Sequence, residues 1–250
     1  MSIASLSRVE VLKLRTTPAI YVSLAIIFVL SLASVVTTIE LAGQNGAPAL
    51  GSVANVSKTL SVSALTAMVM MVVGILLVGG EYRHRTIIGT YLAEPARGRV
   101  LAAKLATVCG LGAVVGAFTF GLALAVAVPL YATKGVHHLA VDIPQLWIGA
   151  VVATACYGLL GVALGALTRN TVAAIIGSIV WVQFVEVVIL QNALPGLAKW
   201  LPTGAAVALT TFGHASSKVL APAAAAAVLV GWTALLAFVA TRITMRRDVN

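Results

Sequence analysis

The sequence predicts an all-α membrane protein that crosses the bilayer six times and forms one domain over residues 1–250. Of these residues, 60% are hydrophobic and 9% are charged, and the mean hydropathy is +1.06. Such a composition lies far outside that of soluble globular proteins. Apolar runs also recur along the chain, each close to the ~20 residues that a helix needs to cross a bilayer. The charged residues concentrate between these runs.

These apolar runs place the six expected spans. The spans lie near residues 18–38, 60–80, 104–130, 146–167, 171–190 and 219–240. A basic segment precedes the first run, as it does in a signal peptide. We expect the run to remain uncleaved, because it is longer than the roughly 7 to 15 residues of a signal-peptide core and more spans follow.

The N-terminal segment, residues 2–15, predicts a helix that lies in the membrane interface. Its apolar residues gather near one face and its charged residues lie elsewhere, which is the pattern of an interfacial helix. The apolar set is Ile3, Leu6, Val9 and Leu12 or Leu14, and the charged set is Arg8, Glu10 and Lys13.

The Lys and Arg residues are distributed unevenly between the two sides of the predicted spans. Twelve lie on the side of both termini, whereas four, Lys58, Lys134, Lys199 and Lys218, lie on the other side. Positively charged connections are retained in the cytoplasm, so we expect both termini there. The net charge of +9 does not indicate a nucleic-acid partner, because the sequence has no basic stripe interleaved with aromatic residues. The expected partner of these cations is the lipid bilayer.

The connection between the second and third spans, residues 81–105, is the longest charged segment of the chain. Five of its residues fall at helical spacing before Pro95 ends the pattern. A short amphipathic helix is therefore expected, and its apolar side can sit in the groove of a partner. The alternative is a solvated connection that only fixes the topology. The helical set is Thr86, Ile87, Ile88, Tyr91 and Leu92.

This connection resembles the one between the second and third spans of ABC-2 type transporter permeases. The family pattern is a Glu that closes the span, a Thr, a Leu-rich turn, a Pro, and basic residues that lead to a Lys. The matching residues are Glu81, Thr86, Leu92, Pro95, Arg97, Arg99 and Lys104. Arg85 stands where the family commonly has Gly, which departs from the pattern in the turn. The six-span layout agrees with the resemblance.

The resemblance implies a permease subunit of an ABC exporter in the inner (cytoplasmic) membrane. It implies separate cytoplasmic ATPase subunits and a second permease, either a copy or a paralogue, that faces the first and fifth spans. No Gly-Lys pair occurs in the chain, so there is no phosphate-binding loop, and we expect ATP and Mg²⁺ on the partner ATPase and no cofactor here. The residues expected to couple to the ATPase are Glu81, Arg83, Arg85, Thr86, Ile87, Ile88, Tyr91, Leu92, Pro95 and Arg97.

The outer connection, residues 191–217, is apolar but interrupted by Pro and Gly. It is too short to cross the membrane twice, so we expect two short helices that enter the outer leaflet and return. ABC-2 permeases are similar here, which implies part of an exit gate. In the fifth span, Glu186 is a costly ionisable group and Gln183 lies near it. We expect Gln183, Glu186 and Pro202 in the translocation path or its gate. The alternative is that Glu186 is structural and either reaches the outer interface or pairs with Lys199.

The substrate class remains open among a drug, an antimicrobial peptide and a lipid, the first two of which would make the protein a resistance exporter. A membrane-embedded immunity or scaffold protein without transport activity is the alternative function. His137, His138 and Asp142 are weak candidates for metal ligands, because adjacent histidines lack a second ligand pair. Cys109 and Cys156 both fall inside spans, where small apolar packing residues are expected rather than a disulfide.

Overall fold

The computed structural model describes residues 3–83, 86, 89–90, 92, 94, 96–212 and 219–246. These residues form helices and no strand, and six of the helical stretches are long and apolar enough to cross a membrane. The all-α membrane fold is therefore confirmed. The six stretches are Pro18–Glu40, Val53–Arg83, Gly98–Thr133, Ile143–Thr168, Thr171–Ala193 and Pro222–Thr244.

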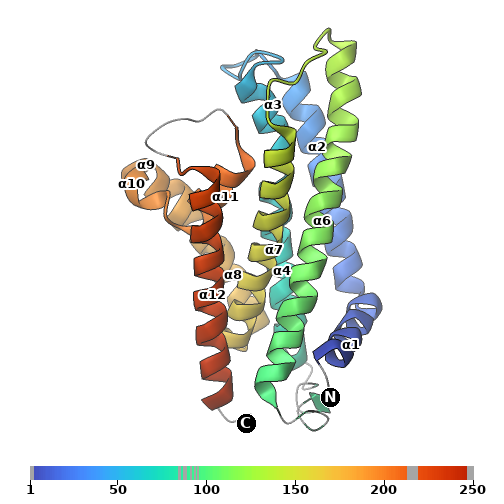
Figure 1. Ribbon diagram of the computed structural model, residues 1–250, viewed down its shortest axis with the longest axis vertical. Coiled ribbons are helices and arrows are strands. Elements are labelled where there is room, and N and C mark those ends of the chain that lie inside the picture. The colour runs from blue at the N-terminus through green and yellow to red at the C-terminus, as the bar shows by residue number, and fades with distance from the viewer. Residues whose placement is uncertain are drawn as a thin grey trace.

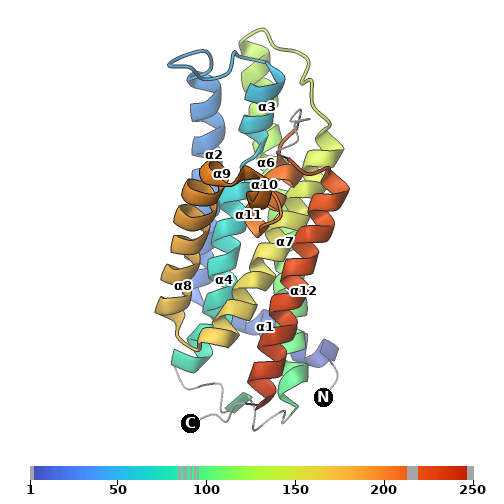
Figure 2. The same ribbon diagram turned by 90° about the vertical axis from the view of Figure 1, so that its left-hand side faces the viewer.

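The membrane-spanning helices run roughly parallel to one long axis and α1 lies across their lower end, with the start of α1 and the end of α12 at the same end (Figures 1 and 2). We call this the α1 end and the opposite one the α3 end. The elements are α1 (Ile3–Thr16), α2 (Pro18–Glu40), α3 (Val53–Leu60), α4 (Ser63–Arg83), α6 (Arg97–Thr133), α7 (Ile143–Thr168), α8 (Thr171–Val180), the π-helix η1 (Trp181–Leu190), α9 (Gln191–Ala193), α10 (Pro195–Ala198), α11 (Pro202–Thr210) and α12 (Pro222–Arg246).

Helices α4 and α7 form the centre of the bundle. In their most apolar windows 67% and 72% of the residues are buried, against 28% in α2 and 22% in both the fifth span and α12. Glycines allow the backbones of α4 and α7 to approach closely. A Cβ on Gly161 would meet the carbonyl oxygen of Met71, and a Cβ on Gly74 would meet the carbonyl oxygen of Gly158. Small residues at such crossings let helix backbones touch in a membrane. The glycines of α7 therefore serve packing within the chain.

Helix α1 packs on the bundle through one face and leaves other apolar residues exposed. Leu6 and Leu14 are buried, but Val9 and Leu12 are 43% and 62% exposed. Between the two buried leucines lies Glu10, which is only 3% exposed. The sequence placed Glu10 among the charged residues away from the apolar face, yet it is buried, because cationic partners offset the cost of its burial.

Two helices extend further than the predicted spans. Helix α4 continues to Arg83 and so includes Glu81, while α6 begins at Arg97, about two turns before Lys104. Glu81 and Lys104 are therefore buried residues of helices rather than residues of a loop. A helical backbone satisfies its own hydrogen bonds, so both helices can continue as long as these side chains are neutralised.

The fifth span changes its helical geometry halfway. Asn170 accepts a hydrogen bond from the backbone N–H of Ala173 and begins α8, and at Trp181 the helix becomes the π-helix η1. The sequence predicts an α-helix throughout, but the wider π turn changes which residues share a face. Figure 1 shows α9, α10 and α11 well below the upper ends of α2 and α6. Helix α11 is held against α7, where Gly149 meets the carbonyl oxygen of Leu209.

Candidate functional site

The connection between the second and third spans is partly described. The backbone N–H of Thr90 donates to the carbonyl oxygen of Thr86 at 3.2 Å, and that of Glu94 to Thr90 at 3.0 Å, which is helical spacing. Leu92 is 79% exposed. Arg85, Ile87, Ile88, Tyr91 and Pro95 lie outside the described residues, as does the side chain of Arg97. The complete amphipathic helix stays a prediction.

A buried group of four charged side chains, which we call the Lys104 cluster, joins α1, α4 and α6. Lys104 Nζ donates to Glu10 Oε2 at 2.7 Å and to Glu81 Oε1 at 2.8 Å. Lys13 Nζ donates to Glu10 Oε1 at 2.8 Å and to Glu81 Oε1 at 2.6 Å. Each lysine therefore bridges the same two carboxylates, so the cluster is neutral as a whole.

The burial of this cluster makes its pairing strong. Lys104 has a side chain that is 2% exposed, and the side chains of Glu10 and Glu81 are 4% and 9% exposed. Lys13 is a third exposed; its burial lowers the pKa, but the hydrogen bonds and charges of Glu10 and Glu81 outweigh this and raise the pKa above its ordinary value. An alkylammonium held between two carboxylates is a rigid link, because breaking it leaves a buried charge without a partner.

The resemblance marked Glu81 and Lys104, but sequence reasoning missed Glu10. The signal was present: Leu6, Glu10 and Leu14 recur every four residues, which places an acid within the stripe that packs on the bundle. A cavity of about 520 Å³ adjoins the cluster, lined by Lys13 and Glu81 together with Ile20, Arg83 and Thr171. It lies where α2, α4 and the start of α8 meet.

The second buried acid, Glu186, lies in η1 and is 2% exposed. Its Oε1 accepts a hydrogen bond from Trp181 Nε1 at 2.6 Å, and its Oε2 accepts one from the backbone N–H of Thr203 at 2.9 Å. Thr203 is in the first turn of α11, so the carboxylate caps that helix and meets the positive end of its dipole. Neither of these donors is Lys199.

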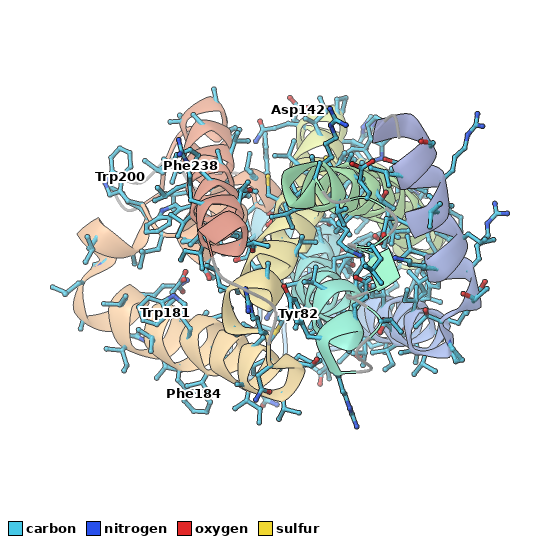
Figure 3. The ribbon with its side chains drawn as sticks, turned by 90° about the horizontal axis from the view of Figure 1, so that it is seen from below. Tyr82, Asp142, Trp181, Phe184, Trp200 and Phe238 are labelled. Carbon is cyan, nitrogen blue, oxygen red and sulfur yellow. The ribbon has the colours of Figure 1, made fainter. Side chains whose placement is uncertain are left out.

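A cavity of about 360 Å³ opens beside Glu186, between the fifth span, α7, α11 and α12. Pro202 also lines it, whereas Gln183 is exposed on another face of η1 and is not among its lining residues. Figure 3 shows Trp181 pointing toward the space between the fifth span and α12, and Phe184 pointing outward. The structure thus brings Glu186 and Pro202 together and leaves Gln183 apart.

Of the weak candidates for metal ligands, Asp142 has a structural role. Asp142 Oδ1 accepts a hydrogen bond from the backbone N–H of Gln145 at 3.1 Å and caps α7. In the described part of the chain no three His, Cys, Asp or Glu side chains gather in a way that would hold a metal ion. Cys109 and Cys156 are free thiols.

The six-span bundle and its charged internal sites define a multi-pass membrane protein. The family described as ABC-2 family transporter protein has a model that matches residues 6–185, well over half of the chain. The chain belongs to this family, and the ABC-2 resemblance of the connection is confirmed. A search of curated proteins found no match. Family membership makes the chain the membrane-embedded permease of an ABC transporter, which associates with an ABC ATPase.

Proposed function

We propose that the chain is the permease subunit of an ATP-driven exporter that moves a hydrophobic or amphipathic substrate out of the cell. ATP and Mg²⁺ are bound by separate ATPase subunits, which dock on the connection between the second and third spans. The Lys104 cluster carries this proposal, because it ties both ends of that connection and helix α1 into one unit. A movement of the ATPase against residues 86–94 is thereby transmitted to α1, α4 and α6.

The α1 end is the cytoplasmic end in this proposal, because it carries twelve of the sixteen basic residues. The protein lies in the inner membrane with both termini in the cytoplasm. Single cysteines in a background without Cys109 and Cys156 test this. Asn45→Cys, in the connection between α2 and α3, should react with an impermeant thiol reagent from outside, and Arg99→Cys should react only after lysis. The opposite pattern would invert the orientation.

A second permease, a copy or a paralogue, covers the face that α2 and α8 share. Figure 2 supports this arrangement, since it has both helices on one side of α4. Large apolar side chains project from both helices: Val29 and Val172 are 65% and 58% exposed. Cysteines at Val172 should crosslink two copies in membranes. Crosslinks that form only through α6 and α7 would refute the arrangement.

Docking of the ATPase is tested on the apolar residues of the connection. Leu92→Asp, and the double variant Ile88→Asp with Tyr91→Asp, should release the ATPase from membranes or uncouple hydrolysis from transport, because an apolar contact with a groove is lost. Leu92→Met keeps the apolar contact and is the matched control. The native chain should carry an ATPase through purification from its own cells. If it does not, and the Asp variants behave like the native chain, the immunity or scaffold alternative replaces the exporter.

Glu186 and Pro202 contribute to the translocation path or its gate in this proposal, since both line one cavity. Gln183 is a weaker candidate because it lies outside that cavity. Glu186→Gln should lower export while the permease still assembles with its ATPase. Normal assembly together with normal export would remove Glu186 from the path.

A further inference from the structure

We propose that the cavity beside Glu186, the Glu186 cavity, binds an amphipathic organic cation with a single positive charge and an aromatic or branched apolar body. This inference rests on the proposed function, since it names the substrate class of that exporter. It is carried by the chemistry of the lining residues: one buried carboxylate, three aromatic rings and otherwise small or aliphatic side chains.

The carboxylate supplies the charge that a cation requires. Among the described residues that line the cavity, Glu186 is the only one with a charged side chain. Its two hydrogen-bond partners, the indole N–H of Trp181 and the backbone N–H of Thr203, are uncharged donors. They and the α11 dipole stabilise a negative charge on Glu186 without cancelling it. The cavity therefore keeps a net negative potential within an apolar surrounding, where a charge interacts more strongly than in water.

The aromatic rings supply the faces that an organic cation prefers. Tyr157, Trp181 and Trp232 line the cavity, and each donates its polar hydrogen to a protein acceptor. Trp181 donates to Glu186, Tyr157 donates to Thr203 Oγ1 at 3.3 Å, and Trp232 donates to the carbonyl oxygen of Trp200 at 2.9 Å. These bonds fix the rings before a ligand arrives, which reduces the entropy lost on binding. Cations bind the faces of Trp and Tyr rings, and most strongly where water is excluded.

The size and access of the cavity narrow the ligand class. A volume of about 360 Å³ holds one compact organic molecule. The ring of Trp181 belongs to a side chain that is 53% exposed, so the cavity is open on the side of the fifth span. An apolar cation can therefore enter from the membrane, whereas a hydrated inorganic cation finds a single carboxylate and too few oxygen ligands.

A pair of probes with one shape and opposite charge tests the inference. Tetraphenylphosphonium and tetraphenylborate should be measured by equilibrium dialysis against the purified chain in lipid nanodiscs, without an ATPase. We expect the cation to bind at least tenfold more tightly than the anion, and Glu186→Gln to remove that preference. Glu40→Gln is the matched control, because Glu40 is an exposed carboxylate paired with Lys134 at 2.9 Å outside the cavity. Equal binding of both probes to the native chain would overturn the inference.

A second variant keeps the test valid if Glu186→Gln does not fold. Trp232→Leu removes a ring while leaving both hydrogen bonds of Glu186 in place, and it should weaken tetraphenylphosphonium binding about fivefold or more. Trp147→Leu is its control: Trp147 also donates to a backbone carbonyl, that of Ala117, but lies outside the cavity. Unchanged binding in Trp232→Leu would refute the site. If the chain binds the cation but no ATPase accompanies it in purification from its own cells, the inference stands while the exporter proposal fails. A chain that purifies with an ATPase but does not bind the cation would do the reverse.

Discussion

The Lys104 cluster and Glu186 are two ways to bury an acid in one membrane protein. In the cluster two carboxylates face two ammonium groups, so charge is balanced within the site and three helices are tied together. At Glu186 a single carboxyl group accepts hydrogen bonds from uncharged donors and lines a cavity. The difference indicates that the Lys104 cluster fixes the positions of three helices, whereas Glu186 is placed to interact with a cation in the cavity.

The helices around the two sites also differ in how deeply they are buried. The cluster adjoins α4, one of the two central helices, with 67% of its apolar window buried. The Glu186 cavity lies between the central helix α7 and two less buried elements, the fifth span and α12, each with 22% buried. Low burial leaves room for a ligand and costs few contacts when a helix moves. The Lys104 cluster is therefore attached to the buried centre of the bundle through α4, whereas the Glu186 cavity has two walls of low burial.

The largest effect is expected where the charge balance is broken. Lys104→Met leaves two buried carboxylates with only the partly exposed Lys13, and should lower the free energy of unfolding by about 3–5 kcal/mol, as for other broken buried pairs. Lys134→Met removes a partner from an exposed pair with Glu40 and should cost about 1 kcal/mol or less. Thermal unfolding in detergent compares the two. Equal losses would mean that the cluster is no stronger than a surface pair.

A smaller effect should follow from crowding the central crossing. Gly161→Ala places a methyl group against the backbone of Met71 and should destabilise the chain by about 1–3 kcal/mol. Gly121→Ala in α6 meets open space and should stabilise the helix by about 0.5–1 kcal/mol, because alanine is the better helix former. Unfolding temperatures that shift in the same direction would contradict the close contact of α4 with α7.

The smallest effect on stability is expected at Glu186. Glu186→Gln keeps an oxygen that can accept from the N–H of Thr203, so we expect a loss of about 1 kcal/mol, the value of one ordinary hydrogen bond. The same variant should have its main effect on export and on cation binding. A loss as large as that of Lys104→Met would assign Glu186 to stability and erase the contrast between the two sites.

Hydropathy and charge by themselves determined the fold class and the six apolar helices, because a bilayer requires long apolar stretches whatever their neighbours. The spacing of Pro and polar residues located the connection between the second and third spans, and the motif within it identified the family. Glu186 was also singled out, since an acid in an apolar run stands out in the sequence alone.

The tertiary structure alone decided what each buried charge meets. Glu10 binds Lys104 across 94 positions of the chain, and Glu186 binds the N–H of Thr203 across 17. Helical periodicity describes one element at a time, so it set Glu10 among the charged residues without showing its burial and kept Gln183 beside Glu186. Which acid lies next to which donor depends on how the helices pack, and on the π-helical turn that begins at Trp181, and neither is encoded in a local pattern.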